Sequence, residues 1–221
     1  VKVGDRVLAK SNTGQYNYQP VYAFGHHNKT ATGVFYQIFT SIGNGSPLEL
    51  TGDHLVYLSK KKNPIRADSL KVGDRLSGDS HSDVVVTGIK KVRNTGLYAP
   101  LTTEGSIVVN GVLASSYVAL QDADKEYLEL PWEKARFPAL SHVCFAHLYL
   151  TPFRTICTVV SSSICQVYDS DGIPFYISLG IKLVQWIFGS NENVLSQILF
   201  FVITVPLLLP FVLVESVLMR A

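Results

Sequence analysis

The chain has 221 residues, which is enough for one large domain or for a domain with an additional segment. Hydrophobic residues make up 47% of it and charged residues 16%, a composition that forms a core and excludes a disordered protein. The formal net charge of +2 is too small to indicate nucleic acid as a partner. The charge is uneven, because residues 1–130 carry 26 charged side chains and residues 131–221 carry only 10. We therefore expect a conventional soluble part, followed by a part that avoids water.

The chain opens at Val1 without a methionine or a signal peptide, on the segment "VKVGDRVLA" at 1–9. This opening has the pattern of the middle of a folded unit, with a turn-forming Gly4-Asp5 pair followed at once by a strand-like run. We therefore expect that an upstream part of the protein precedes this sequence.

The first half contains two copies of one β-strand unit. Four segments recur in the same order, and the offset between the copies shortens along the chain. The matching pairs are 1–9 with 70–78, 21–27 with 84–91, 32–40 with 95–103, and 46–58 with 105–117. Each segment is rich in Val, Ile, Tyr, Phe and Thr, with turn residues between segments, which predicts strands. We expect a mainly β fold in which a pseudo-twofold axis relates the two copies.

The hairpin predicted at "PLELTGDHLVYL", residues 47–58, carries polar residues at its turn. Gly52 and Asp53 are ordinary turn residues, and they separate Thr51 from His54. Taken alone, such a pair is most often a turn threonine and a surface histidine with satisfied hydrogen bonds. A pseudo-twofold axis, however, tends to bring equivalent turns together, so this turn is a candidate functional site.

The first half also resembles the Hint (Hog) autoprocessing domain, an intein-like domain in the C-terminal half of hedgehog and hedgehog-related proteins. The blocks that carry the resemblance are "GDRVLA" at 4–9, "VFYQI" at 34–38, "LTGDHLVYL" at 50–58, "YAPLTTEGSIVVNGVLASSYV" at 98–118 and "HVCFAHLYLTPFR" at 142–154. The fourth block is the most specific, because it separates hedgehog-type domains from inteins. The match covers roughly residues 1 to 155 and implies a Hint fold for the first half.

The resemblance implies self-processing chemistry. In the family, a cysteine at the first position of the domain attacks the preceding peptide carbonyl and converts the amide into a thioester, an N-to-S acyl shift. The resemblance assigns His54 to the scissile amide nitrogen as proton donor, a role that suits a side chain of near-neutral pKa. Thr51 would hydrogen-bond the same peptide and hold it in a strained geometry.

The family's second step gives the partners. The upstream segment of the protein's own precursor is transferred from the thioester to a sterol hydroxyl, so a sterol or another lipid alcohol is an expected co-substrate, and no cofactor is implied. A zinc site built from His26, His27 and His54 is a different interpretation of these imidazoles. It is disfavoured because no acidic or cysteine residue has a suitable spacing.

The chain departs from the family pattern at three points. Within residues 24–28, His26 stands where the family has an aspartate as general base for the acceptor hydroxyl, and a neutral imidazole can also take that proton. Ser116 replaces a family cysteine that can pair with the nucleophile, and no cysteine precedes Val1. We interpret the sequence as truncated downstream of its nucleophile; a degenerate copy that acts as an interaction module or membrane anchor is the alternative.

The second half is more apolar and is predicted to be helical in parts. Residues 137–165 are mixed, residues 173–189 are mostly apolar, and residues 194–214 form a run of 21 residues without a charged side chain. The last run is typical of a transmembrane helix, in which Pro206 and Pro210 would introduce kinks. The alternatives are a helical hairpin that dips into one leaflet and a buried core helix.

We predict three regions: a Hint domain at 1–122, a linker with the start of a lipid-recognition region at 123–172, and a membrane-associating segment at 173–221. The resemblance places the domain in the secretory pathway. Asn28-Lys29-Thr30 and Asn44-Gly45-Ser46 both match the N-glycosylation pattern, which is consistent with a lumenal domain.

The three cysteines, Cys144, Cys157 and Cys165, all lie in the second half. Their spacings match neither a CxxC metal site nor a redox pair. We therefore interpret them as buried free thiols, which leaves the redox compartment open.

Overall fold

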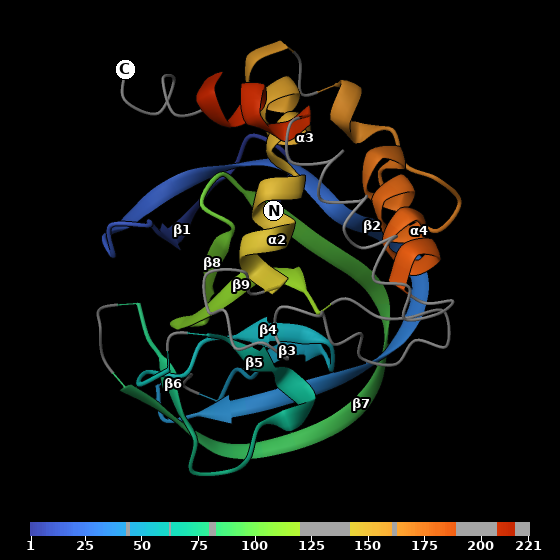
Figure 1. Cartoon of the computed structure of the whole chain (residues 1–221). Helices are drawn as coiled ribbons and strands as arrows, with labels where there is room; N and C mark the ends of the chain where they lie inside the picture. Colours follow the sequence, from blue (N-terminus) through green and yellow to red (C-terminus); the bar gives the residue numbers. More distant parts are fainter. Residues whose placement is uncertain are drawn as a thin grey trace. The chain divides into compact units, whose positions relative to one another are not determined.

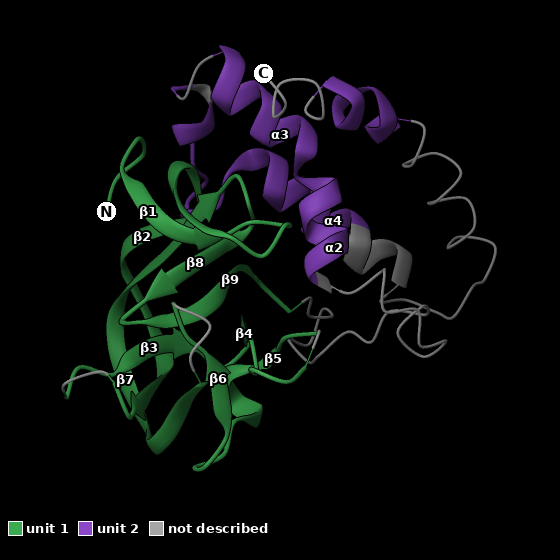
Figure 2. Cartoon of the chain, turned by 90° about the vertical axis from the view of Figure 1, so that its left-hand side faces the viewer, with its two compact units in different colours: residues 1–119 green, residues 120–221 purple. Residues whose placement is uncertain are grey.

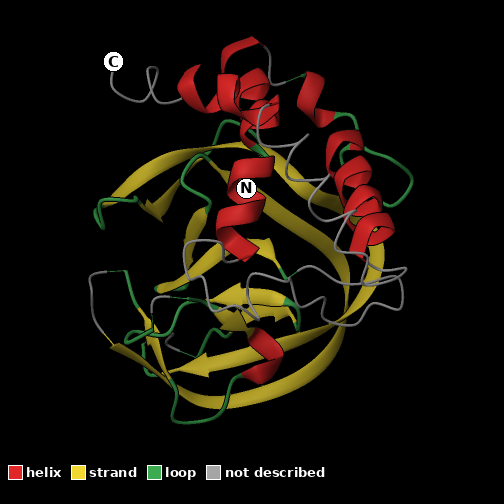
Figure 3. Cartoon of the chain, in the orientation of Figure 1, coloured by secondary structure: helices red, strands yellow, loops and turns green. Residues whose placement is uncertain are grey.

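The computed structural model describes residues 1–42, 45–61, 63–79, 83–119, 142–160, 163–188 and 207–214. The chain divides into two compact units, Val1–Ala119 and Leu120–Ala221 (Figure 2). The first unit is built mainly of strands, and the described part of the second unit is mostly helical (Figure 1, Figure 3). The predicted order of a mainly β part followed by a helical part is confirmed, whereas the boundaries predicted at residues 122 and 172 stay predictions.

The described strands of the first unit are joined by turns and short loops, whereas the helical elements between residues 142 and 160 of the second unit follow one another almost directly. The strands are β1 (Arg6–Lys10), β2 (Tyr16–Thr40), β3 (Leu48–Thr51), β4 (His54–Val56), β5 (Ile65–Arg66), β6 (Arg75–Ser77), β7 (Asp83–Thr102), β8 (Ser106–Val109) and β9 (Val112–Val118). The helical elements are η1 (Ala67–Ser69), α2 (His142–Tyr149), α3 (Thr151–Thr155), the π-helical η3 (Ile156–Val160), η4 (Ile164–Gln166) and α4 (Phe175–Phe188).

Two antiparallel sheets make up the first unit. One has the strand order β1-β2-β7-β6, with β3 also paired to β2, and the other has the order β5-β4-β9-β8. The long strands β2 and β7 pair with each other, and Figure 1 shows them as two curved ribbons that run together around the unit. Their pairing contains several register shifts, which allow such long strands to bend while they stay hydrogen-bonded.

The two copies open with the same turn. The Gly4 amide donates to the Val21 carbonyl, and the Gly73 amide donates to the Val86 carbonyl, both at 2.9 Å. In each copy the aspartate after the glycine accepts a 2.9 Å hydrogen bond from the backbone N–H three residues earlier. Gly4 and Gly73 both have a positive φ, +93° and +95°. The repeat predicted from the sequence is therefore confirmed down to individual hydrogen bonds.

The copies meet along symmetric pairs of strands. β2 pairs with β7, its counterpart in the second copy, and β4 pairs with its counterpart β9. In the second pair, Val56 lies opposite Ala114, and each is the third residue of its strand. The predicted pseudo-twofold relation between the two copies is therefore present in their strand pairing.

The main core of the first unit draws on both copies. Its buried members are Ile38, Leu48, Leu50, Val56, Ala67, Leu70, Leu76, Val84, Val86, Ile107, Val112 and Ala114. Burial of a Val, Leu or Ile side chain stabilises a fold by about 1.5–3 kcal/mol. Because the cluster mixes residues from the two copies, the hydrophobic contribution to stability requires both.

The second unit is held by reciprocal tyrosine contacts. The Tyr149 hydroxyl donates to the Tyr176 carbonyl at 3.2 Å, and the Tyr176 hydroxyl donates to the Tyr149 carbonyl at 3.0 Å. The two rings stack with centroids 5.1 Å apart. A Cβ at Gly180 would lie 2.2 Å from the Tyr149 hydroxyl oxygen, so only glycine allows α4 to approach so closely. The apolar stretch predicted at 173–189 thus forms helix α4.

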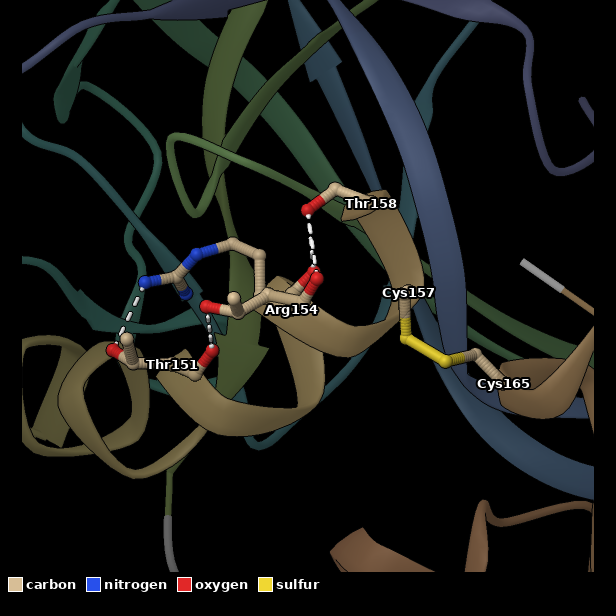
Figure 4. Close-up of a disulfide and its surroundings, with 6 residues drawn as sticks. Thr151, Arg154, Cys157, Thr158 and Cys165 are labelled. Carbon is tan, nitrogen blue, oxygen red and sulfur yellow. Dashed lines mark hydrogen bonds between the residues drawn. A yellow bond between two sulfur atoms is a disulfide. The ribbon is translucent and has the colours of Figure 1, made fainter. Parts of the chain in front are cut away.

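Cys157 and Cys165 form a disulfide, with Cα atoms 5.7 Å apart (Figure 4). Both half-cystines are buried, whereas Cys144 is exposed and is not part of a disulfide. The interpretation of the three cysteines as buried free thiols is therefore wrong. A separation of eight residues gives no recognisable motif, so the sequence alone does not reveal the pair.

The helices next to the disulfide share a network of hydrogen bonds around a buried arginine. Arg154 donates to the His147 carbonyl at 3.2 Å and to Thr151 Oγ1 at 3.0 Å. The Thr158 hydroxyl donates to the Arg154 carbonyl at 2.8 Å (Figure 4). These bonds connect the end of α2 with α3 and η3, so the guanidinium group ties successive helical turns together.

No single helix in the described part of the chain is long and apolar enough to cross a bilayer. The segments Val143–Tyr149 and Thr151–Val160 reach that length and composition together, with a bend of 52° between them. The transmembrane helix predicted at 194–214 lies mostly outside the described residues. Its last part, 207–214, is helical.

The two opening turns provide a test of the fold. A Cβ at Gly73 would meet no atom within 4 Å, so Gly73→Ala probes the positive φ alone. We expect the free energy of unfolding, measured by urea denaturation, to fall by about 1–2 kcal/mol. Gly88→Ala is the control, because Gly88 lies within β7 and an added Cβ would make ordinary contacts at 3.7 Å. Equal losses in the two variants would contradict the strained turn.

Candidate active site

Thr51 and His54 flank the turn at which the chain passes from one sheet to the other. Thr51 is the last residue of β3 and lies opposite Phe35 on β2. His54 is the first residue of β4 and lies opposite Val118 on β9. Both residues are half-buried. The structure therefore brings together the two residues that the sequence singles out, at the junction of the sheets.

The turn itself is fixed by close contacts on both sides. The Gly52 carbonyl accepts a hydrogen bond from the Asp68 amide at 3.0 Å, and the Asp53 carbonyl accepts one from the Ala119 amide at 2.9 Å. A Cβ at Gly52 would lie 2.9 Å from the Tyr36 ring, which is too close for any other residue without a shift. The turn therefore has little freedom to rotate, and neither has the His54 backbone.

The imidazole of His54 is oriented by a backbone carbonyl. Its Nε2 lies 2.8 Å from the carbonyl oxygen of Ser115. Because a carbonyl oxygen only accepts, Nε2 carries the proton and the lone pair of the neutral ring lies on Nδ1. Burial lowers the pKa of His54, against the smaller opposing effects of the Ser115 hydrogen bond and the Asp53 carboxylate. The ring is therefore neutral near pH 7, with a defined tautomer.

Ser115 is itself held rigidly. It is fully buried, and its hydroxyl accepts a hydrogen bond from the Tyr117 amide at 3.0 Å and lies 3.4 Å from the Gly105 carbonyl. The Tyr57 side chain also hydrogen-bonds Ser115, while burial raises the pKa of this phenol. The sequence did not point to Ser115 or Tyr57, because a main-chain acceptor and its supports follow no motif.

A series of paired residues leads from β9 to the opening turn of the chain. Beside the acceptor of His54 on β9, the Ser116 hydroxyl lies 3.4 Å from Thr102 Oγ1. Thr102 is opposite Val21 across β2 and β7, and the Val21 carbonyl accepts the hydrogen bond from the opening turn at Gly4. A short series of paired residues therefore connects the His54 site with the start of the chain.

His26 lies on a separate element, the long strand β2. Phe24 is opposite Pro100 and His27 is opposite Tyr98, so Gly25 and His26 together face a single residue of β7. This bulge leaves His26 half-buried and His27 exposed. The structure does not pair His26 with the Thr51–His54 turn, and its proposed role as a base stays a prediction.

The other polar groups of the described chain give no metal centre. Within the described residues, no group of three or more His, Cys, Asp or Glu side chains is arranged to hold a metal ion. The chemistry of the site therefore has to be argued from the imidazole, the hydroxyls and the backbone groups around the turn.

Comparison with known proteins identifies the fold. A family model described as the Hint module matches residues 1–128. The chain belongs to the Hint family. The resemblance found in the sequence is confirmed, and so is the duplicated, intein-like architecture.

Relatives of this Hint domain include hedgehog-type proteins. Warthog protein 6 of Caenorhabditis elegans is 35% identical over 141 residues, which cover 59% of this chain and 23% of that protein. Sonic hedgehog protein of Danio rerio is 27% identical over 207 residues, which cover 85% of this chain and 44% of that protein. The chain thus spans less than half the length of each, and it is a hedgehog-type Hint domain.

A solved intein structure is similar to part of the chain. The DnaB intein from Synechocystis aligns with a TM-score of 0.44 and 12% sequence identity, covering 53% of this chain and 82% of the intein. At the level of the family, Hint domains are autoprocessing domains. The roles expected for Thr51 and His54 in that chemistry stay predictions.

The burial of His54 predicts a pH effect on stability. Because the folded-state pKa lies below the ordinary value of 6.5, the unfolded chain binds the proton first as the pH falls. The contribution of His54 to stability is therefore fully present above pH 6.5 and is lost as the pH falls below it. We expect the urea midpoint to fall between about pH 7.5 and about pH 5 by more in the natural chain than in His54→Gln. Equal losses in both proteins would show that His54 is not buried in its neutral form.

Proposed function

We propose that this chain is the self-cleaving part of a larger hedgehog-type precursor. In this proposal the upstream segment of the precursor ends in a cysteine that starts the domain, and its thiol forms a thioester with the preceding residue. The observation that carries the proposal is the 2.8 Å contact between His54 Nε2 and the Ser115 carbonyl oxygen, which orients the imidazole at the Thr51–His54 turn.

In the first step, the imidazole of His54 both takes up and returns one proton. Nδ1 of His54 takes the proton of the cysteine thiol while the sulphur attacks the preceding carbonyl carbon. The imidazolium then returns this proton from Nδ1 to the amide nitrogen, the C–N bond breaks, and the thioester and a free amine remain. The Nε2 hydrogen bond to Ser115 holds the ring in both protonation states. Burial lowers the pKa of His54, so the ring is unprotonated near pH 7 and its Nδ1 is available to take up the thiol proton.

Thr51 has a positioning role in this proposal. It sits at the opposite end of the same rigid turn, where its hydroxyl would hydrogen-bond the scissile peptide and hold it away from planarity. A planar amide resists attack because resonance strengthens its C–N bond, so distortion lowers the barrier. The close packing of Gly52 on Tyr36 supports this role, since it fixes the spacing between Thr51 and His54.

The acceptor in the second step is a sterol, another lipid alcohol or water. We propose that His26 acts as the base that deprotonates an acceptor hydroxyl, in place of an aspartate. Its half-buried position in the β2 bulge supports this assignment, because bulges redirect side chains and occur near functional sites. Ser116 is buried and stands where the family has a cysteine. This replacement favours the rival function, in which the domain has lost catalysis and acts as an interaction module.

We also propose that the second unit contacts lipid in the secretory pathway. Phe175, Leu179 and Leu183 are spaced four residues apart on α4, and their side chains are 73%, 51% and 39% exposed. Such an apolar stripe in contact with water is unusual for a soluble helix and suits a lipid surface. The Cys157–Cys165 disulfide supports an oxidising compartment, because disulfides persist there and are rare in the cytosol.

The first step can be tested on the precursor that includes its natural upstream segment. A small thiol should intercept the thioester and release two fragments, resolved by mass spectrometry. We expect His54→Ala to slow this cleavage about 100-fold or more, in line with the usual contribution of a general acid–base group. His27→Ala is the matched control, because His27 is an exposed histidine outside the turn. Unchanged cleavage in His54→Ala, or no thiol cleavage in the natural protein, would favour the interaction module.

The same precursor separates the two steps. With His26→Ala, thiol-induced cleavage should remain close to that of the natural protein, while attachment of a lipid alcohol to the upstream fragment should be lost. The mass of the released fragment reports the attachment directly. Retention of the attachment in His26→Ala would remove His26 from the second step.

A further inference from the structure

The first of the two glycosylation patterns lies on a large bulge of β2. Asn28 is opposite Leu97 and Thr32 is opposite Thr95, so residues 29–31 face the single residue Gly96. The chain therefore projects from the β2–β7 pair at this point. Gly96 has a φ of +101°, which marks the bend of the partner strand at the same level.

The bulge is closed by the side chain of the asparagine. Asn28 Oδ1 accepts hydrogen bonds from the Thr30 amide at 3.0 Å, the Thr30 hydroxyl at 2.9 Å and the Ala31 amide at 3.0 Å. The hydroxyl that completes the glycosylation pattern is thus bonded to the amide that would be modified. These three bonds use Oδ1 and not Nδ2, the atom that a glycan would join, so they are compatible with a substituent on Nδ2.

The surroundings leave room for a large substituent. Lys29, Thr30 and Thr32 are exposed on β2, and so is Thr95 on the opposite strand. Gly96, across from the bulge, has no side chain. A glycan is bulky and strongly hydrated, so it is tolerated in a folded protein only at such a surface.

We propose that Asn28 is an N-glycosylation site. Nδ2 of Asn28 would form a bond to the anomeric carbon of an oligosaccharide carried by a lipid pyrophosphate. The bond between that carbon and the phosphate oxygen breaks, the lipid pyrophosphate leaves, and the amide gives up one proton. The disulfide between Cys157 and Cys165 supports the compartment in which this transfer occurs, because the bond needs oxidising conditions.

The proposal has a consequence for the orientation of the first unit. A glycan on Asn28 keeps the bulge at residues 28–32 in water, so this edge of the β2–β7 pair does not lie against a bilayer or a tightly bound protein. The site is independent of the acyl shift, because Asn28 takes no part in the proposed chemistry. Failure of one proposal therefore leaves the other standing.

The experiment uses the full precursor, expressed in eukaryotic cells behind a cleavable signal sequence. A reporter N-glycosylation triplet on a flexible C-terminal tail shows that the protein has entered the lumen. Asn44→Gln removes the second triplet of this sequence, whose asparagine lies outside the described residues. Any triplet elsewhere in the precursor is removed by the same Asn→Gln change, so that only Asn28 and the reporter remain. Digestion with peptide N-glycosidase then reports occupancy as a shift in electrophoretic mobility.

We expect the Asn44→Gln protein to carry two glycans, and the Asn28→Gln/Asn44→Gln protein to carry the reporter glycan alone. Thr30→Ala in the Asn44→Gln background should also lose one glycan, whereas Thr30→Ser should keep it, because serine preserves the hydroxyl. A reporter that is glycosylated while Asn28 stays unmodified in the Asn44→Gln protein would overturn the proposal. So would a second glycan that survives Asn28→Gln/Asn44→Gln.

Discussion

The hydrogen bond from His54 Nε2 to the Ser115 carbonyl, 2.8 Å long, is the interaction on which the proposed chemistry depends. It decides which nitrogen of the ring carries the proton and therefore which nitrogen is available to react. Burial alone would keep the ring neutral but would leave its tautomer and orientation undefined. The combination of a buried ring and a fixed carbonyl acceptor gives a base that is neutral near pH 7 and oriented before any substrate binds.

This interaction exists only because the chain is duplicated. His54 comes from β4 of the first copy, and Ser115 comes from β9 of the second. The two strands pair with each other, with Val56 opposite Ala114. A single copy would contain the turn but no acceptor for the imidazole. The two copies therefore contribute different groups to the proposed chemistry: the first supplies the histidine, and the second supplies the carbonyl that orients it.

The repeat, the opening turns and the pair Thr51–His54 could be predicted from the sequence, because glycine-aspartate turns and alternating β patterns are local signals. Long-range features could not. Ser115 acts through its backbone, so no residue type at position 115 reveals the contact. The disulfide between Cys157 and Cys165 could not be predicted, because a separation of eight residues matches no cysteine motif. The bulge at Gly25 and His26 depends on the register between β2 and β7, and that register cannot be predicted from the sequence alone.

The most direct test of this account is the protonation state of the His54 ring in the folded chain. Nitrogen-15 NMR of the imidazole at about pH 7, assigned by comparison with His54→Gln, distinguishes the two neutral tautomers from the imidazolium. The account predicts a neutral ring with its proton on Nε2. A ring that carries its proton on Nδ1, or that is doubly protonated at this pH, would contradict the central claim.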